Sequence, residues 1–507
     1  MNYTQKTIVL ILVASLVRCC IALSVGLGND EVYYRMYAEQ LQFNYFDHPP
    51  FVGWLIRCTT FNLEVDTVFF IRLGALICAA ITSWMFFLSG KLLQSPQVGF
   101  ISALLYNCSI YGSIIAGTFI LPDTPQMVFW SVAIFIILKL LHQNVQPKSQ
   151  NILLVWFGVT VGLAMLCKIH SIFLWLGFII YIVLYHRSIL KNKYVYVAAF
   201  ISLLLFLPVI VWNINNHFIT YQYHGNRVNV LNNFSLNIST LVAFLVGQFF
   251  YTNPIVFISV TIATIAAFKN KLFIAAPHKK ILLLLGVPII FVCITLAFFK
   301  QVLPHWSGPG ISTLILLSGC YLFQIKLQRA YVYIKLSVGF IFMIIIAGLL
   351  VIHFYPGTIG SKNISNLGEG DFTLDLIGWK NLKKDVAEII KKDKISFKMK
   401  PNAFFVSHKW FPAAHIDYYV AKPLHKTLVA LGDTNDIHQY AWLNNARPKI
   451  NIGDDAYCIV PSNNNIDVAK IFSPKFNTIL KPDTINQIRN GKLCRQFYVW
   501  KLKGFKN

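Results

Sequence analysis

Carboxylates are rare and one-sided in the first 355 residues of this 507-residue chain, where only seven occur, all before residue 124. They are Asp30, Glu31, Glu39, Asp47, Glu64, Asp66 and Asp123. In a segment this apolar, a carboxylate is costly and usually lies in water, in an ion pair or at a working site. A carboxylate at a membrane surface can also take a proton from a hydroxyl within about 3 Å. We therefore expect general-base chemistry in residues 28–66, which hold six of the seven.

Two polar pairs in this loop are the strongest candidates. Asp30-Glu31 precedes a run with an apolar residue at every fourth position of 33–41, which predicts a short helix lying along the membrane surface. Asp47-His48 is followed by two prolines that fix the backbone and so the directions of both side chains. Each pair has a structural alternative: an acidic helix N-terminus for the first and a plain loop turn for the second.

The elements that must hold this loop are apolar runs. The chain is 56% hydrophobic and 15% aromatic, and its runs repeatedly approach the roughly 20 residues that a helix needs to cross hydrocarbon. We expect eleven spans, near residues 8–27, 67–89, 98–119, 124–142, 152–167, 171–186, 194–213, 239–268, 281–299, 308–325 and 331–354. The net charge of +24 does not indicate a nucleic-acid partner, because the cations lie mostly between these runs or in the tail.

The distribution of cations also predicts a topology. With the N-terminus in the cytoplasm, one side of the membrane receives Lys91, Lys148, the Arg187/Lys191/Lys193 cluster, the Lys269 to Lys280 cluster and Lys326/Arg329. The positive-inside rule makes that side cytoplasmic, so the acidic loop 28–66 faces outward. The first apolar run lacks a clear small-residue cleavage site and is expected to remain as a span.

Composition changes near residue 356 and predicts a second domain. Residues 356–507 hold 23 of the 44 Lys and Arg and no further apolar run long enough to span. A helix is expected at 378–394, with short β-rich runs at 403–407, 427–431, 456–460 and 496–501. We therefore predict a membrane domain at 1–355 and a small extracytoplasmic α/β domain at 356–507. A disulfide between Cys458 and Cys494 is left open, because pairing cannot be read from sequence.

Several motifs along the chain resemble a known family. They are Asp-Glu at 30–31, Tyr-Phe-Asp-His-Pro-Pro at 45–50, Leu-Pro-Asp-Thr-Pro at 121–125, the Trp-Asn segment 208–217, Leu-Pro-His-Trp at 303–306 and the segment 371–379. Together they look like the GT-C type polyprenyl-phosphate-dependent glycosyltransferases, specifically the bacterial group of aminoarabinose transferases and relatives of protein mannosyltransferases. The resemblance covers about residues 30–380.

The resemblance implies an α-helical polytopic fold and an inverting transferase. Such an enzyme moves a sugar from a polyprenyl-phosphate carrier, undecaprenyl phosphate in bacteria, to a lipid, glycan or protein acceptor outside the cytoplasmic membrane. By their places in the motifs, Asp30 would be the catalytic carboxylate, with Glu31 beside it, and Asp47 and Asp123 would line the same cavity. The aminoarabinose transferases carry Glu-Lys where this chain has Asp47-His48, so phosphate binding must rest on His48 or other cations.

A lipid-anchored phosphate donor needs cations at the outer interface, to hold the phosphate and to stabilise charge as the bond breaks. Candidates on that side are His48, Arg57, Arg72, Lys168, His170, Arg227 and Lys300, with His305 in the His-Trp loop. Arg227 is preferred because a guanidinium grips phosphate through two hydrogen bonds. A divalent metal stays open: histidines and Asp47 are suitable ligand types, but no short-spaced ligand pair occurs.

Two other classes of function compete with the transferase. A transporter or flippase of lipid-linked glycans would place ionisable residues near the membrane midplane, often in related halves, whereas these acids cluster at one face and no repeat is visible. A scaffold without catalysis could use its basic tail to bind anionic cell-wall material. No nucleotide-binding phosphate loop is present in the sequence, so a cytosolic nucleotide donor is not indicated.

Overall fold

The computed structural model describes residues 1–142, 146–229 and 235–506, and the chain divides into two compact units. The first unit comprises Met1–Ala22 and Leu41–Ile344, and the second comprises Leu23–Gln40 and Ile345–Asn507. The short segment that carries Asp30 therefore groups with the C-terminal part of the chain.

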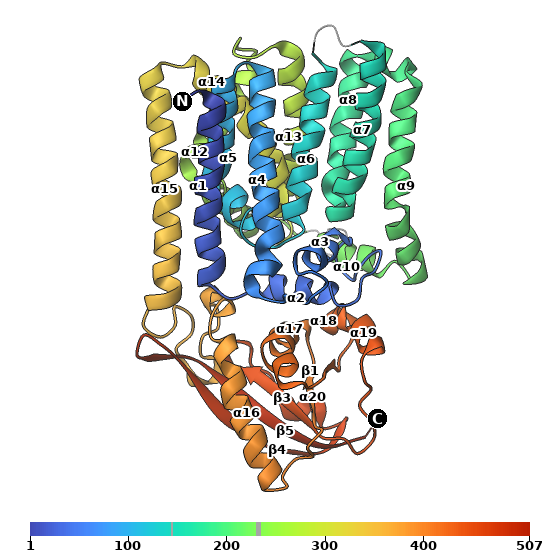
Figure 1. Cartoon of the computed structure of the whole chain (residues 1–507), viewed down its shortest axis with the longest axis vertical. Coiled ribbons are helices and arrows are strands. Elements are labelled where there is room, and N and C mark those ends of the chain that lie inside the picture. Colours follow the sequence, from blue (N-terminus) through green and yellow to red (C-terminus); the bar gives the residue numbers. More distant parts are fainter. Residues whose placement is uncertain (143–145, 230–234, 507) are drawn as a thin grey trace. The chain divides into compact units, whose positions relative to one another are not determined.

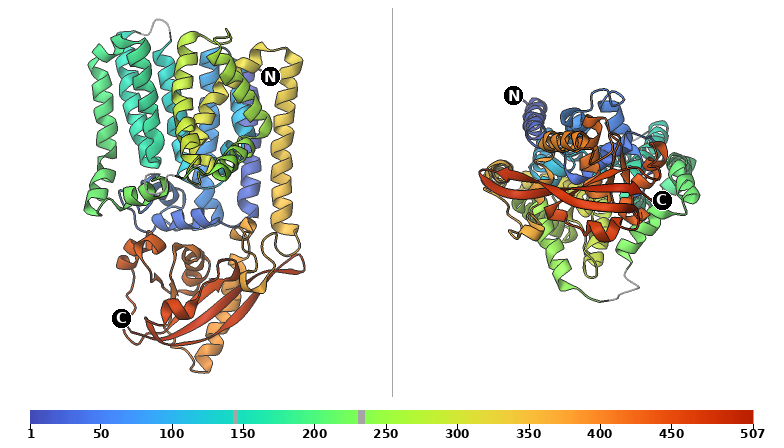
Figure 2. Two further views of the ribbon diagram at one scale, coloured as in Figure 1. Left: turned by 180° about the vertical axis from the view of Figure 1, so that it is seen from behind. Right: turned by 90° about the horizontal axis from the view of Figure 1, so that it is seen from below.

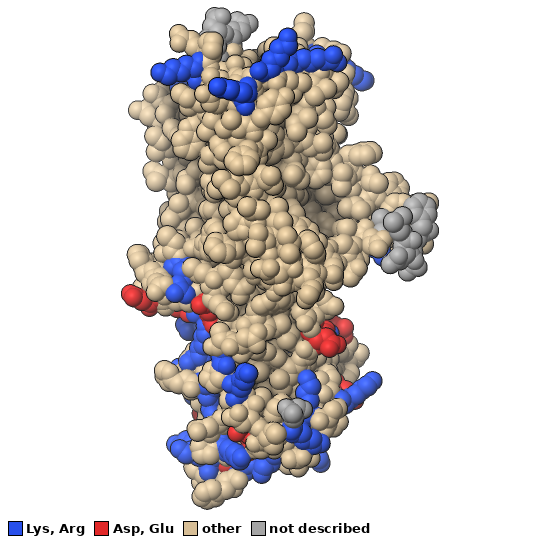
Figure 3. All heavy atoms as spheres, turned by 90° about the vertical axis from the view of Figure 1, so that its right-hand side faces the viewer, with Lys and Arg blue, Asp and Glu red and all other residues tan. Residues whose placement is uncertain are grey.

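The first unit is built from helices, most of which run side by side (Figure 1). They are α1 (Tyr3–Ser24), α3 (Phe51–Thr59), α4 (Val68–Leu93), α5 (Pro96–Cys108), α6 (Asp123–Leu140), α7 (Pro147–Cys167), α8 (Phe173–Tyr185), α9 (Lys193–Asn215), α10 (Ile219–Val228), α11 (Ile238–Tyr251), α12 (Pro254–Phe268), α13 (Ala276–Ala297), α14 (Gly308–Gln324) and α15 (Leu327–Phe354). On the face shown in Figure 3, the surface between the two ends of this bundle is largely free of Lys, Arg, Asp and Glu. A surface of this kind suits contact with hydrocarbon.

Among the described residues, seven helices are long and apolar enough to cross a membrane: α1, α4, α6, α7, α9, α13 and α15. The predicted single span at 239–268 is instead two helices, α11 and α12, bent by 103°. The bend falls at Asn253, whose φ of 75° leaves the helical region, and Pro254 then starts the next helix. The Asn253 amide donates to the carbonyls of Cys108 and Ser337, both at 3.0 Å, which holds the bend in place. The count of eleven spans stays a prediction.

The C-terminal part of the second unit contains a five-stranded sheet with the order β2-β1-β3-β5-β4. The strands are β1 (Phe404–Ser407), β2 (Leu428–Ala430), β3 (Ala456–Pro461), β4 (Phe476–Arg489) and β5 (Lys492–Phe505). β1 pairs in parallel with β2 and β3, whereas the long hairpin β4–β5 adds antiparallel strands (Figure 2). The predicted helix is α16 (Trp379–Ile395), which buries Trp379, Leu382 and Val386.

The sequence patterns missed β4 and left one disulfide open. Nearly every position of β4 is exposed or half-buried, so the strand shows no apolar alternation that could have revealed it.

Cys458 lies opposite Trp500 in the β3–β5 ladder, and Cys494 lies six residues earlier on β5. At the rise of a strand this separation is roughly 20 Å, so the two cysteines cannot pair, and both are buried free thiols.

The second unit also contains α2 (Asn29–Tyr37), and a buried network of charges fastens the C-terminal end of this helix. Glu39 accepts from Arg35 and Lys422 and, at 2.8 Å, from Arg447. The same Arg447 nitrogen lies 2.6 Å from Asp417. Burial alone would raise the pKa of Glu39, but the three cations lower it to about 2. Because each charge is compensated, the network can persist out of water.

Hydrogen bonds and ring stacking hold the N-terminal end of α2. The Asn29 side-chain oxygen lies 2.8 Å from Nε2 of His415, whose ring stacks on Trp379 at 4.2 Å between centroids. Further along, the hydroxyl of Tyr33 accepts from the backbone N–H of Gln439 at 3.2 Å. Both ends of this short helix are thus fixed to the C-terminal part of the same unit.

Replacing Arg447 by alanine tests the charge network. The change leaves two carboxylates, Glu39 and Asp417, with less compensation, and breaking a buried pair typically costs about 3–5 kcal/mol. We expect a clearly lower unfolding temperature in detergent, followed by tryptophan fluorescence. The control is Lys449→Ala, which removes an exposed cation. Equal unfolding temperatures for the two variants would contradict a stabilising role of the network.

The surroundings of Asp375 predict that the stability of the second unit depends on pH. Burial raises the pKa of Asp375 to about 6, although a hydrogen bond with Asn29 and the charge of Arg495 act in the opposite direction. The folded state therefore binds this proton more tightly than the unfolded chain, whose aspartates titrate near about 3.9. The resulting stability is complete below pH 4 and is lost as the pH rises through 6. Asp375→Asn should flatten the unfolding temperature between pH 4 and 7, whereas the exposed Asp385→Asn should leave the wild-type slope. A slope that persists in Asp375→Asn would assign the effect to another group.

Candidate functional site

The two acidic side chains at the start of α2, Asp30 and Glu31, have different surroundings. Glu31 is 2% exposed, and its carboxylate accepts from the backbone N–H of Gly28 at 2.9 Å. Glu31 therefore caps the helix, as the structural alternative for this pair predicts. Asp30 is exposed in the first turn of the same helix. Of the two carboxylates, Asp30 is the one that solvent or a ligand can reach.

Within the first unit, a buried ion pair joins the start of α6 to the end of α7. Asp123 Oδ2 lies 2.8 Å from Lys168 Nζ, and the two side chains are 2% and 8% exposed. The hydroxyl of Tyr111 donates to the other carboxylate oxygen at 3.2 Å. Sequence reasoning missed Tyr111, because one tyrosine in an apolar run carries no signal. It reaches Asp123 from a π-helical turn, Tyr111–Ile115, a feature frequent at functional sites.

The segment that carries Lys168 is tied to α6 by an amide. Gln126 Nε2 donates to the Ser171 hydroxyl at 2.8 Å and lies 3.0 Å from His170 Nε2. Both contacts position the break between α7 and α8, and with it the lysine. Gln126 was also missed, although an amide within an apolar span is itself a signal of a polar task.

The loop with Asp47 and His48 is pinned to the segment that contains α10. Asn44 is fully buried and donates to the Thr220 hydroxyl at 2.9 Å. His224 Nε2 lies 2.6 Å from the backbone oxygen of Asp47, and its ring centroid is 5.8 Å from that of His48. These contacts bring the predicted Asp-His-Pro-Pro turn together with α10, which follows the Trp-Asn segment, across more than 170 residues of sequence.

The two histidines predicted to meet the donor are electrically neutral at pH 7. Burial lowers the pKa of His48 to about 3, although Asp47 acts to raise it. Burial, with the charge of Lys168, lowers the pKa of His305 to about 4. Both imidazoles respond to the charges of Asp123 and Lys168, which places these side chains in one cluster. They can donate or accept hydrogen bonds there, but the positive charge must come from other residues.

Arg227 provides an accessible cation in the same unit. Its guanidinium carbon lies 5.6 Å from the ring centroid of Tyr223 and 5.7 Å from that of Trp306. Arg227 is exposed, and across the described ranges it makes no ion pair with a carboxylate. Its charge also acts on His305 and His224. Two aromatic rings therefore hold the guanidinium while its N–H groups stay available to an anion.

The remaining candidate cations have other surroundings. Arg72 is fully buried and donates to the carbonyl of Ala22 at 3.1 Å. Arg57 bonds the side chain of Asn62, and Lys300 is half-buried in the turn after α13. For a metal, no three His, Cys, Asp or Glu side chains converge as ligands in the part of the chain that the structure describes.

Sequence comparison relates the chain to enzymes that transfer sugars. Residues 47–212 match the family described as dolichyl-phosphate-mannose-protein mannosyltransferase. The lipid A galacturonosyltransferase RgtD of Rhizobium johnstonii is 23% identical over 279 residues, which make up 55% of this chain. The chain spans 57% of the length of this curated relative.

Structural comparison extends the likeness to both units. The crystal structure of ArnT from Cupriavidus metallidurans bound to undecaprenyl phosphate is similar with a TM-score of 0.61 at 12% identity, covering 97% of each chain. ArnT in the apo state gives 0.58 at 13% identity, covering 98% of each chain. At such identities the structural match shows a shared fold only. The relationship in sequence comes from the match to RgtD. The chain is thus a relative of the GT-C glycosyltransferases and has the ArnT-like fold over nearly its whole length.

Proposed function

We propose that this protein is an inverting glycosyltransferase that takes a sugar from a polyprenyl-phosphate carrier, such as undecaprenyl phosphate. The observation that carries the proposal is the polar cluster of the first unit, in which Lys168 and Arg227 provide positive charge beside neutral histidines. A fold like that of ArnT, which was crystallised with undecaprenyl phosphate, supports the same donor class. The site and the second unit lie on the outer face of the bacterial cytoplasmic membrane in this proposal, as the positive-inside rule predicts.

The donor phosphate binds mainly to Arg227, whose planar guanidinium offers two parallel N–H groups to phosphate oxygens. Lys168 adds a second charge as the glycosidic bond breaks and negative charge grows on the leaving phosphate. Asp123 directs the Lys168 ammonium group through the 2.8 Å pair. His48 and His305, being neutral, contribute hydrogen bonds to the sugar or the phosphate, and Asp47 helps to orient that group.

Asp30 acts as the base in this proposal. Its carboxylate takes the proton of the acceptor hydroxyl while the oxygen attacks the anomeric carbon. The bond to phosphate breaks in the same step, and the polyprenyl phosphate leaves with the bonding electrons, so the configuration inverts. Glu31 supports this reaction by capping α2 and so fixing the helix that carries Asp30.

The acceptor is a component of the cell envelope. RgtD is named for lipid A, so lipid A or lipopolysaccharide is the first acceptor to try, followed by other envelope glycans and by protein. The proposed contacts of Arg227 and Lys168 are made to the phosphate, so these two cations suit any sugar that the carrier holds.

Asp30→Asn is the direct test of the proposed base. Loss of a general base typically costs about 10²- to 10⁴-fold in rate, so transfer from a panel of polyprenyl-phosphate sugars in membranes should fall by that factor. Glu64→Gln, an exposed acid of the same predicted loop, should retain wild-type transfer. Full activity of Asp30→Asn would remove Asp30 from the role. Transfer that is absent from every donor with the folded wild type and an envelope extract would favour a transporter of lipid-linked glycans.

Arg227→Ala tests the phosphate contact. A charge-assisted hydrogen bond is worth roughly 1.5–3 kcal/mol, which corresponds to about a 10- to 100-fold weaker apparent affinity for the donor. We expect KM for the donor to rise by this factor with a smaller change in kcat, and Arg227→Lys to recover part of the loss. Lys362→Ala, which removes an exposed cation elsewhere, serves as the control. An unchanged KM in Arg227→Ala would exclude this arginine and leave the rest of the proposal intact.

A further inference from the structure

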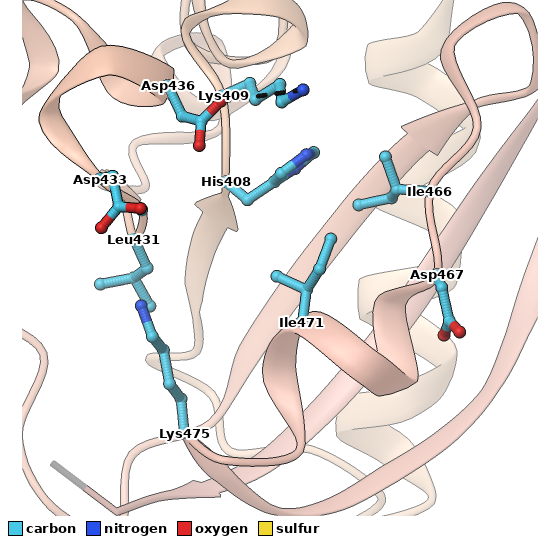
Figure 4. Close-up of a pocket in the computed structure, with 10 residues that line it drawn as sticks. His408, Lys409, Leu431, Asp433, Asp436, Ile466, Asp467, Ile471 and Lys475 are labelled. Atoms are coloured by element: carbon cyan, nitrogen blue, oxygen red, sulfur yellow. Dashed lines mark ion pairs between the residues drawn. The ribbon is translucent and has the colours of Figure 1, made fainter.

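The second unit contains a cavity of about 560 Å³ that the proposed reaction does not use. It lies at the carboxyl ends of the parallel strands β1, β2 and β3 and is lined by the loops that follow them (Figure 4). His408 and Lys409 follow β1, residues 431–436 follow β2, and residues 466–475 follow β3. This edge is where open α/β sheets place their ligands, and the volume falls within the usual range for small-molecule sites.

The two loops on one side of the cavity are built to approach closely. A Cβ atom on Gly432 would lie 2.5 Å from the backbone oxygen of His408 and 3.0 Å from the Ile437 side chain. Any larger residue would push the β2 loop away from the β1 loop. The glycine therefore maintains the shape of this wall.

His408 is the most informative side chain of the cavity. It is only 9% exposed, lines the cavity and has no hydrogen-bond partner within the described ranges. Burial and the neighbouring charge of Lys409 lower the pKa of His408 to about 4, so the ring is neutral at pH 7. A neutral imidazole that lines a cavity can both donate to and accept from the hydroxyl groups of a ligand.

The charges around His408 argue against an anionic ligand. Asp433 makes no side-chain hydrogen bond within those same ranges, and its negative charge acts on Lys475. Lys409 lies 3.8 Å from Asp436, and Asp467 caps the helix α20 (Val468–Phe472). Three carboxylates thus face two ammonium groups around the cavity.

The walls of the cavity are partly apolar. Ile466 and Ile471 lie on one side of it, and Leu431 lies across from them among the polar groups (Figure 4). A sugar ring has this same combination, with an apolar face and a rim of hydroxyls that both donate and accept.

We propose that this cavity binds a saccharide of one or two rings without net negative charge. Hydroxyl groups of the ligand pair with His408, Asp433 and Lys475, and one face of the ring packs on Ile466 and Ile471. This site is separate from the proposed transfer chemistry and does not depend on it, so either can fail alone. It would give the second unit a glycan-binding role in addition to holding α2.

Binding of soluble sugars to the purified full chain, in a detergent without a sugar headgroup, tests the proposal. Galactose, glucosamine and the β1,4-linked disaccharide of N-acetylglucosamine are titrated, with galactose 1-phosphate as the anionic probe, and binding is followed by saturation-transfer NMR and calorimetry. Asp433→Asn and His408→Leu should each weaken the best uncharged or amino sugar by about tenfold or more. The exposed Glu388→Gln should bind as wild type does.

Asp433 is exposed, so its amide variant should fold even if His408→Leu does not. The proposal is overturned if Asp433→Asn binds the sugar as Glu388→Gln does, because binding would then lie elsewhere. It is equally overturned if no uncharged or amino sugar binds saturably, or if galactose 1-phosphate binds more tightly than galactose, since the cavity would then be empty or an anion site.

Discussion

The cost of charge in an apolar bundle is the constraint on which the first unit depends. Two examples among the described residues show how buried charged side chains there are held by polar partners. Asp123 and Lys168 satisfy each other at 2.8 Å, and Arg18 within α1 donates to Asn107 at 2.7 Å and to the carbonyl of Gly112 at 3.2 Å. A buried pair of this kind is weak evidence for stability, because desolvation offsets most of the attraction. Its position, where one helix begins and another ends, suits a task that needs fixed charges, such as holding a phosphate.

Burial also determines which polar groups of this cluster carry a charge. The same desolvation that would penalise an unpaired lysine makes the imidazoles of His48 and His305 neutral. Charge therefore resides on lysine and arginine, while the histidines retain both donor and acceptor capacity. The proposed donor combines a phosphate with a hydroxylated sugar. The cations suit its phosphate, and the neutral histidines suit its hydroxyl groups.

The second unit joins α2, from the beginning of the chain, to a domain from its end. The Glu39 network and the Asn29–His415 contact hold a helix of only nine residues, which would be marginal alone. An exposed carboxylate on so short a helix would otherwise be poorly oriented. The fold therefore gives the C-terminal domain a mechanical role, and the cavity at its strand ends suggests that it also recognises a ligand.

The sequence by itself determined the features that depend on local residue patterns and on the free-energy cost of burying a charge. The apolar runs, the one-sided acids, the helix predicted at 378–394 and the break at Asp47-His48-Pro49-Pro50 follow from hydropathy, rare carboxylates and proline stereochemistry. Tertiary structure alone decided the long-range pairings: Tyr111 with Asp123, His224 with the Asp47 backbone, and Glu39 with Arg447. It also decided that Cys458 and Cys494 stay apart, since their distance depends on the register of β3 and β5. Such contacts bring together residues whose separation in sequence carries no periodic signal, and burial, which sets the charge of His48, exists only once the chain has folded.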